Sequence, residues 1–348
     1  MILMTSIPLD RIVEHLNCGM GVVHNLLLIY LIRRYSRIEL GTYKYLLAGF
    51  SAYDIYLSII HSIVNPKTLR VNSTYGTVAH SYIESAHLLS IYYACFSISF
   101  ALLNIHFLYR YWTIRHPDLV SYFSKPKFIA LIGLYLAGQY ILWHFIAMTI
   151  SPEPDDPSLP VMREAFKAIY NDTVMNGWLI MDHWRNGQFN YATLTLLLPS
   201  FVVMGAQFSA ATYLGWGAYR GIATAESISQ AHRTFQLKIL IAVCAQTFVP
   251  LFCVYLPYSC IFAFPLLGIP DCGIFYIFPV LVSFFPAWDA IVITSFIKDY
   301  REGLLRLLSI QSVKTTTKTA VAAFTSQDMT TVTTERWAEP AKVKRLPN

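Results

Sequence analysis

Charge is the property that this sequence has least of. Only 13% of its 348 residues are charged, whereas 55% are hydrophobic and the mean hydropathy is +0.46. An ordinary soluble domain has about a quarter of its residues charged. The shortfall therefore favours a chain that is surrounded by lipid, and it argues against a soluble protein and against a nucleic-acid partner.

Several catalytic motifs are also absent. The sequence has no HExxH of a metalloprotease, no GxSxG of a hydrolase, no glycine-rich phosphate loop, and no lysine for a retinal Schiff base in its last apolar segment. Five histidines lie in four different apolar segments, namely His24, His61, His87, His106 and His144. Their spacing is not that of metal ligands, so we interpret each as a packed, hydrogen-bonding residue. We therefore expect no enzyme activity, no metal site and no cofactor.

What the sequence does have is seven apolar segments of membrane-spanning length. A transmembrane helix needs about 20 residues, and a charged loop follows each segment. We predict an all-α membrane protein with a bundle of seven transmembrane helices. The predicted helices occupy residues 12–32, 43–64, 83–110, 128–150, 190–219, 238–264 and 273–297. No similarity between the two halves is visible, so the inverted repeat of many transporters has no support.

The residues after the seventh segment differ in character. Residues 298–308 place leucines on one side and cations on the other, which is typical of a short helix on the membrane surface. Residues 309–334 include twelve serines or threonines and few bulky apolar side chains, which predicts disorder. We expect a seven-helix domain over residues 1–308 and a disordered cytoplasmic tail over residues 309–348.

The basic residues predict the orientation of the chain. Twenty of the 26 lysines and arginines fall in the loops and tail on the C-terminal side of the bundle. Positively charged loops stay in the cytoplasm, so we expect the N-terminus outside and the C-terminus inside. Both glycosylation sequons, at Asn72 and Asn171, fall in loops assigned to the outside. The second sequon lies in a proline-rich, acidic loop over residues 151–190, which we interpret as a solvated lid.

Three polar residues interrupt the apolar segments at nearly one depth. Counted inward from the cytoplasmic basic residues, Asn25, Asp54 and Asp289 lie about 12, 15 and 13.5 Å inside the membrane. An isolated aspartate in lipid is costly, so the three residues are candidates for a cluster that shares hydrogen bonds, a proton or a cation. The alternative is three unrelated polar residues, each satisfied by its own neighbours.

Two predicted helices carry prolines seven residues apart, which places each pair on one face of its helix. These are Pro250 and Pro257 on the sixth helix and Pro279 and Pro286 on the seventh. Each proline weakens the backbone hydrogen bonding of its helix, so the pairs are candidate hinges. Prolines are also commoner in membrane helices than in soluble ones, and a role without hinge motion stays open.

Four stretches of the sequence together resemble a known family. They are "GTYKYLLAGFSAYDIYLSIIHSIVNP", "HFLYRYWTIRHP", "LKILIAVCAQTFVPLFCVYLP" and "FPAWDAIVITSFIKDYR". Their order and spacing are similar to those of the nematode seven-transmembrane chemoreceptors of the Str class, including the close Srj group. The resemblance covers all seven helices. It implies an olfactory-type receptor in the plasma membrane of a sensory cilium, which detects a small odorant or other chemical cue and acts through a heterotrimeric G protein.

The same resemblance suggests a role for Tyr109, Arg110 and Tyr111, at the inner end of the third helix. Rhodopsin-like receptors keep an acid, an arginine and an aromatic residue at this place for the G protein. Here Tyr109 replaces the acid, so the ion pair of that class cannot form. We expect Arg110 to present a cation and five donors at the water boundary. The alternative is a membrane anchor between aromatic neighbours.

Cysteine use also departs from the rhodopsin-like pattern. The loop over residues 151–190 has no cysteine, so the disulfide that joins this loop to the third helix in rhodopsin-like receptors cannot form. Five of the six cysteines lie in predicted helices, where a free cysteine behaves as a small hydrophobic residue. Cys18 and Cys272, each near the outer end of its helix, are a candidate disulfide pair.

The sequence does not name the ligand. The outer halves of the predicted helices offer an aromatic and weakly polar set that suits a small volatile or amphipathic molecule. These candidate ligand residues are Glu84, His87, Tyr92, Tyr258 and Tyr276. The alternative function is a ligand-gated cation channel or a transporter. A conducting path favours polar residues at many depths, and evoked current in cells without G-protein signalling would favour this alternative.

Overall fold

The computed structural model describes residues 7–37, 40–81, 83–185, 187–224, 229–270 and 274–309. The chain divides into two compact units, Met1–Arg301 and Glu302–Asn348. In the second unit residues 302–309 are described, and they continue a helix that begins at residue 298. The rest of the predicted tail and Cys272 lie outside the described residues, so the disorder of the tail and the disulfide stay predictions.

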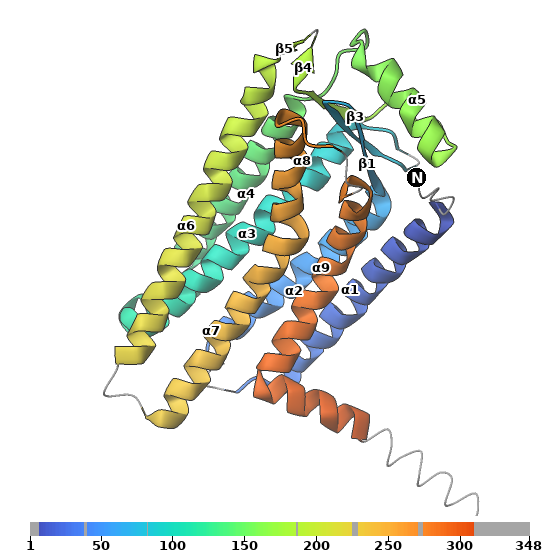
Figure 1. Cartoon of the computed structure of the whole chain (residues 1–348). Coiled ribbons are helices and arrows are strands. Elements are labelled where there is room, and N and C mark those ends of the chain that lie inside the picture. Colours follow the sequence, from blue (N-terminus) through green and yellow to red (C-terminus); the bar gives the residue numbers. More distant parts are fainter. Residues whose placement is uncertain are drawn as a thin grey trace, which may run out of the picture. The chain divides into compact units, whose positions relative to one another are not determined.

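Among the described residues, seven helices are long and apolar enough to cross a membrane, which confirms the predicted fold class. They are α1 (Ile7–Tyr35), α2 (Tyr43–Val64), α3 (Ala86–Arg115), α4 (Pro126–Met148), α6 (Leu194–Thr224), the continuous helix formed by α7 (Gln230–Pro250), η4 (Leu251–Tyr255) and α8 (Leu256–Leu266), and α9 (Ile274–Phe296). Figure 1 shows these helices running alongside one another within the first unit.

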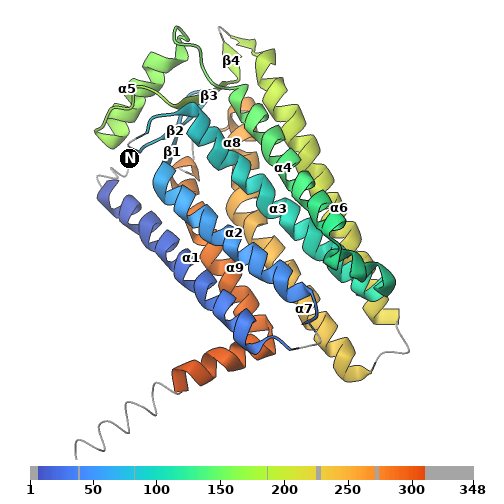
Figure 2. The same cartoon turned by 180° about the vertical axis from the view of Figure 1, so that it is seen from behind.

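α3 is the central helix of this bundle. It begins at Ala86, where the Ser85 hydroxyl caps it by accepting a hydrogen bond from the backbone N–H of Leu88. It packs on α4 and α6 on one side and on α2 and α7 on the other, as Figure 2 also shows. Its side chains are buried along most of its length. α4 is also apolar but fully buries only three side chains, so much of its surface is open to lipid.

α1 packs closely on both α2 and α9 because a glycine lies at the contact. A Cβ atom at Gly21 would lie 2.5 Å from Oγ of Ser58 on α2 and 3.4 Å from Cβ of Pro286 on α9. Small residues allow this close approach, which is a main source of helix association in lipid. Asn17 adds a hydrogen bond from its Nδ2 to Oγ of Ser283, at 3.0 Å.

A three-stranded antiparallel sheet, which the sequence analysis did not predict, lies at the end of the bundle where α1 begins (Figure 2). α2 ends at Val64 because Asn65 takes a left-handed conformation and Pro66 cannot continue the helix. The chain then forms the hairpin of β1 (Pro66–Val71) and β2 (Thr74–Ala79), and β3 (Trp178–Asp182) adds to β2. In this register Gly76 faces Ile180.

The loop over residues 151–190 is folded rather than a solvated lid, so that prediction was wrong. Its helix α5 (Ser158–Tyr170) buries Leu159, Met162 and Phe166, whose spacing places them on one face. This face packs on Trp178 and the apolar side chains of the sheet. The sequence analysis interpreted the whole loop from its proline-rich start and overlooked the helical periodicity of the apolar residues that follow. A small hairpin of β4 (Trp184–Arg185) and β5 (Gln188–Phe189) leads into η3 (Tyr191–Thr193) and α6.

The predicted prolines accompany local irregularities of their helices. Pro250 ends α7, and Pro257 stands in the first turn of α8, so the two prolines flank the π-helical turn η4. A proline has no backbone N–H to donate, and π-helical turns often mark functional sites in helices. On α9 the carbonyl of Pro286 accepts a hydrogen bond from Asn25 of α1, at 2.8 Å. Whether these places act as hinges stays a prediction.

Candidate functional site

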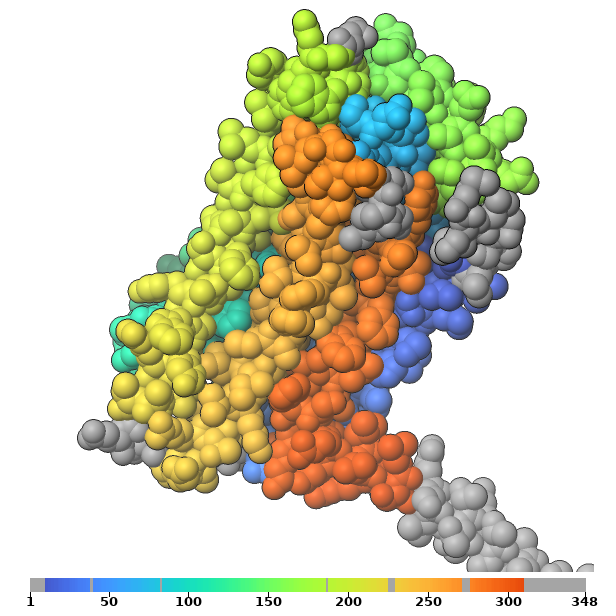
Figure 3. Space-filling view, viewed as in Figure 1, coloured from blue at the N-terminus to red at the C-terminus, as the bar shows by residue number. Residues whose placement is uncertain are grey.

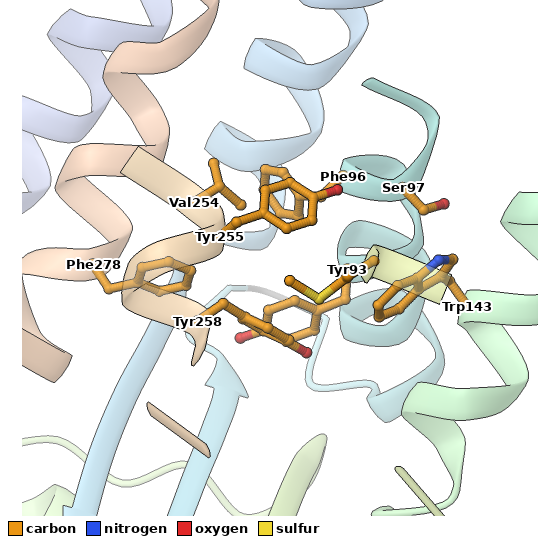
Figure 4. Close-up of a pocket in the computed structure, with 9 residues that line it drawn as sticks. Tyr93, Phe96, Ser97, Trp143, Val254, Tyr255, Tyr258 and Phe278 are labelled. Atoms are coloured by element: carbon orange, nitrogen blue, oxygen red, sulfur yellow. The ribbon is translucent and has the colours of Figure 1, made fainter. Parts of the chain in front are cut away.

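An aromatic cavity lies between α3, α4, α6, the η4–α8 segment and α9 (Figure 4). We call it the aromatic cavity; its nine lining residues, all uncharged, are Tyr93, Phe96, Ser97, Trp143, Met204, Val254, Tyr255, Tyr258 and Phe278. The free volume of the cavity is about 30 Å³, which is enough for about two water molecules. A ligand of odorant size therefore needs some lining side chains to move, and the flexible thioether of Met204 is suited to that.

Two polar side chains of the aromatic cavity, those of Tyr93 and Ser97, form hydrogen bonds within the protein. The hydroxyl of Tyr93 shares a hydrogen bond with Oγ1 of Thr77, at 2.7 Å, which ties the cavity to strand β2. Ser97 donates to the carbonyl of Ala94 on its own helix, at 2.8 Å. The indole Nε1 of Trp143 is buried, and none of the described residues provides it with an acceptor. The cavity therefore has an unmet hydrogen-bond donor and no charge.

Of the five candidate ligand residues, Tyr258 lines this cavity and two others are engaged elsewhere. The carboxylate of Glu84 accepts hydrogen bonds from the backbone N–H groups of residues 175 and 176, at 3.0 and 2.8 Å, and so holds the chain that leads into β3. Tyr92 is buried, and its hydroxyl lies 2.6 Å from Nδ1 of His61. Glu84 precedes α3 and holds a loop, whereas the α3 residue Tyr92 points to α2.

The remaining two candidates are also distant from the lining. His87 is exposed and stacks on His144 of α4, with ring centroids 5.8 Å apart. Tyr276 packs against the cluster of α5 and the sheet. The five candidates from the sequence thus include one residue that lines the cavity. The sequence analysis did not identify the lining residues Tyr93, Trp143 and Tyr255. Aromatic residues are so frequent in this chain that residue type alone does not distinguish residues that line the cavity from residues that pack in the core.

The sequence analysis also missed a buried charged cluster that joins α1, α2, α3 and β1. Nζ of Lys67 donates to Oε1 of Glu14 at 2.7 Å, and Nε2 of His61 lies 3.6 Å from Oε2 of the same carboxylate. His61 in turn contacts Tyr92. The side chains of Glu14, His61 and Lys67 are at most 4% exposed. A buried ion pair is tolerated only while both partners are present, so this cluster fixes the sheet on the bundle.

The structure brings Asp54 and Asp289 together inside the bundle. Both are almost completely buried, and the helices that carry them, α2 and α9, are in contact. None of the described groups donates a hydrogen bond to either carboxyl group. Asn25, also buried, donates to the carbonyls of Gly21 and Pro286 at 2.9 and 2.8 Å. Two neighbouring buried carboxyl groups cannot both stay ionised unless a cation lies between them. Without a cation, one of the two holds a proton.

Arg110 is buried, which corrects the expectation that it lies at the water boundary. The residue is 2% exposed, and its guanidinium carbon lies 3.5 Å from the centroid of the Tyr43 ring on α2. Its Nη1 donates to Oε1 of Gln236 on α7, at 3.2 Å. The anchor interpretation needs a cation that reaches water, and this geometry does not provide it. Arg110 instead joins α2, α3 and α7.

The two tyrosines beside Arg110 have different surroundings. The hydroxyl of Tyr109 lies 3.1 Å from Oγ1 of Thr42, before α2, and its ring stacks at a tilt on that of Tyr43. Tyr111 faces α6, where a Cβ atom at Gly217 would lie 2.6 Å from its ring. The tyrosine that replaces the acid therefore contributes packing and a neutral hydrogen bond, and Gln236 provides the polar partner of the arginine.

A polar pocket of about 470 Å³ opens between the end of α4, the start of α5 and β3. Burial is the largest influence on Asp156 and would raise its pKa, but hydrogen bonds from Ser158 and Arg185 outweigh it, so the pKa lies below its ordinary value. Arg185 also lies 3.5 Å from Asp182. The pocket is thus lined by ionised groups, in contrast to the aromatic cavity. Among the described residues no group of three or more His, Cys, Asp or Glu side chains could hold a metal ion.

The described residues thus form seven helices of membrane-spanning length, with a buried arginine near the C-terminal end of the third. A sequence model described as "Serpentine type 7TM GPCR chemoreceptor Str" matches residues 10–305. The chain therefore belongs to the Str family of serpentine chemoreceptors, a family of G protein-coupled receptors, and is a multi-pass membrane protein. This confirms the resemblance that the sequence motifs indicated.

Individual relatives come from nematodes of the genus Caenorhabditis. The chain is 25% identical over 311 residues to Serpentine receptor class r-10 of Caenorhabditis elegans, which covers 84% of this chain and 91% of the relative. It is 26% identical over 325 residues to Serpentine receptor class delta-1 of the same species, covering 86% and 82%. A third relative, G-protein coupled receptor str-217, is 24% identical over 310 residues, covering 83% and 86%.

Proposed function

We propose that this chain is a chemosensory receptor that binds a small uncharged molecule in the aromatic cavity and signals to a heterotrimeric G protein. The observation that carries the proposal is that one continuous helix contributes to both places. Tyr255 and Tyr258 line the cavity from η4 and α8, and Gln236, at the other end of the same helix, contacts Arg110. A movement of this helix on ligand binding changes the contact of Arg110.

The chemistry of the aromatic cavity supports a neutral ligand with one hydrogen-bond acceptor. No charged side chain lines the cavity, and a charged molecule would lose its hydration without gaining a partner. The indole N–H of Trp143 is the donor that such an acceptor would meet. Apolar and aromatic walls with a few directed polar groups are typical of small-molecule sites.

The surroundings of Arg110 support a switch at the face where the G protein would bind. While Gln236 and the Tyr43 ring hold the guanidinium, its donors point into the bundle. Moving α7 away from α3 breaks the hydrogen bond to Gln236 and exposes a planar group with five N–H donors. Such a group suits the carbonyls at the end of an incoming helix. The π-helical turn between Pro250 and Pro257 is where we place the bend.

We infer that Asn25, Asp54 and Asp289 act as an intramembrane switch in the same movement. Asn25 joins α1 to α9 at Pro286, next to the turn that carries Asp289. A bend of α9 at Pro279 or Pro286 changes the separation of the two carboxyl groups. Their shared proton or cation is bound with a different affinity in each state, which couples its occupancy to the active conformation.

We further propose that the N-terminus is outside, that the tail is in the cytoplasm, and that the receptor acts in the plasma membrane of a sensory cilium. The excess of basic residues on the side of the tail supports this orientation. Asn72, in the β1–β2 turn, and Asn171, at the end of α5, are both exposed. This exposure suits glycosylation at both sequons.

A ligand screen in heterologous cells tests the proposed function. The full-length chain is expressed with a promiscuous G protein, and second-messenger level and membrane current are recorded together while neutral small molecules are applied. We expect a second-messenger response without current, and we expect the response to vanish in Arg110→Ala cells at equal surface expression. A current that persists in cells without G-protein signalling would overturn the proposal in favour of a ligand-gated channel.

A further inference from the structure

A long groove runs between α6 and α7, in the half of the bundle that contains Arg110. It has a volume of about 720 Å³, and Figure 3 shows the hollow between the side chains of the two helices. Phe107 of α3 forms part of its lining, and the groove side of α6 includes Gly215, where a Cβ atom would lie 3.1 Å from the Phe107 ring. A glycine at this place leaves the groove open where the two helices approach α3.

The groove is lined mainly by apolar and aromatic side chains. Of its three hydroxyls, those of Thr212 and Thr247 each donate to a carbonyl of their own helix, at 2.8 Å, and the third belongs to Tyr219, at the end of the groove beside Arg220. The other lining side chains are hydrocarbon or aromatic, apart from the thiol of Cys244. An occupant therefore gains nothing from polar atoms along the groove, whereas a hydrocarbon chain gains contact along its whole length.

The length of the groove matches one leaflet of a bilayer. On α6 it extends from Phe208 to Tyr219, eleven steps along the chain, and on α7 and η4 from Leu237 to Leu251, fourteen steps. At 1.5 Å per residue these stretches are about 17 and 21 Å long. Half of the hydrocarbon core is about 15 Å thick. A single acyl chain therefore fits along the groove from its charged end to the middle of the membrane.

Two cations lie just beyond the charged end of the groove. Arg220 follows Trp216 by one helical turn, and its guanidinium carbon lies 5.2 Å from the centroid of the Trp216 ring. Lys238 precedes Ile241 by three residues on α7, and both cations are exposed. Trp216 and Tyr219, which line this end, are the residue types that favour the headgroup level. The two helices thus form an apolar groove with positive charge at one end.

We propose that the α6–α7 groove binds one acyl chain of an anionic phospholipid, whose headgroup lies between Arg220 and Lys238. Hydrocarbon contact along the groove provides the affinity of the chain, and the two cations select the headgroup. Each cation near the membrane surface favours an anionic lipid by about fivefold. The site is separate from the aromatic cavity and from Arg110, so it does not depend on the identity of the odorant.

Photo-crosslinking tests this site in the full-length receptor. The protein is placed in phosphatidylcholine nanodiscs that contain a minor fraction of phosphatidylserine with a diazirine on its acyl chain. A parallel sample contains phosphatidylcholine with the same diazirine chain. After irradiation, labelled peptides are mapped by mass spectrometry. We expect the phosphatidylserine probe to label residues 208–219 and 237–251 about fivefold or more above the phosphatidylcholine probe.

Two variants, each with a control, distinguish a built site from ordinary lipid contact. Arg220→Gln should reduce the preference for phosphatidylserine about fivefold, whereas Lys127→Gln, at the start of lipid-exposed α4, should leave it unchanged. Cys244→Trp should fill the groove and lower labelling by both probes, and Cys244→Ser is its control. Equal labelling by the two probes, or a preference that Arg220→Gln leaves intact, would overturn the proposal and indicate non-selective lipid contact. If Cys244→Trp does not fold, the comparison of Arg220→Gln with Lys127→Gln still tests the proposal.

Discussion

The guanidinium of Arg110 and the ring of Tyr43 form a cation–π contact inside the bundle, with the carbon of the guanidinium 3.5 Å from the ring centroid. Desolvated contacts of this kind are worth about 2 kcal/mol. Together with the hydrogen bond to Gln236, the contact compensates part of the cost of burying a cation. Arg110 is therefore held in place by neutral partners on two other helices.

Removing the partner of Arg110 should activate the receptor, and removing Arg110 should silence it. Gln236→Ala deletes a hydrogen bond to a charged group, worth about 1.5–3 kcal/mol, so the equilibrium should shift toward the active state and basal second-messenger level should rise. Arg110→Ala should abolish signalling while ligand affinity without G protein stays near normal. Both are measured at equal surface expression.

Arg115→Ala is the matched control for Arg110→Ala, because Arg115 lies on the same helix but its guanidinium is exposed. It should change signalling little. If Arg110→Ala lowered surface expression while signalling per receptor stayed intact, Arg110 would have a structural role only.

Asp54 and Asp289 should behave as a coupled pair. Asp54→Asn and Asp289→Asn each remove one ionisable group, so each should shift basal activity or ligand potency. The proposed sharing of a proton or cation predicts that the double variant differs from the sum of the singles, with a coupling of about 0.5–3 kcal/mol. A double-mutant cycle at matched surface expression measures this coupling. Strict additivity would show that the two residues act independently.

Trp143→Phe should weaken the agonist found in the heterologous screen. The substitution keeps an aromatic ring in the cavity but removes the indole N–H, and a lost hydrogen bond of about 0.5–1.5 kcal/mol lowers potency about two- to tenfold. Dose–response curves measure the change. Trp184→Phe, on the exposed strand β4, should leave potency unaltered. An unchanged potency in Trp143→Phe would show that the ligand does not use this donor.

Removing one partner of the ion pair between Lys67 and Glu14 should destabilise the receptor more than removing both partners. Lys67→Met leaves a buried carboxylate without its partner and should destabilise the receptor by about 3–5 kcal/mol. Replacing both residues by leucine removes the charges together and should restore much of the loss. Thermal unfolding of the purified receptor measures both. Equal destabilisation by the single and double variants would contradict this account of the cluster.

The proposed orientation predicts that Asn72 and Asn171 carry glycans and that a C-terminal tag is protected in intact cells. Thr74→Ala and Thr173→Ala should each abolish one sequon while keeping its asparagine, so each should remove one glycosidase-sensitive shift in gel mobility. Extracellular protease should spare the tag. Cleavage of the tag from outside would reverse the orientation and contradict the receptor mechanism.

Much of the fold could be predicted because hydropathy reports directly on the membrane. Seven apolar segments define seven helices, and the depths of Asn25, Asp54 and Asp289 follow from a rise of 1.5 Å per residue. The motif around Arg110 is local and was also recognisable. These features depend on position along the chain, so they need no knowledge of which helices meet.

The tertiary structure decided which face of each helix turns inward. Lipid and the protein interior are both apolar, so an all-round apolar helix such as α3 or α4 does not reveal its own rotation. For this reason the sequence analysis assigned Tyr92 to a ligand site, missed Trp143, and placed Arg110 at the water boundary. The partners of Arg110 and of Glu14 are far away in the chain, at Gln236 and Lys67. Only packing brings such residues together, because no local pattern specifies a contact between distant segments.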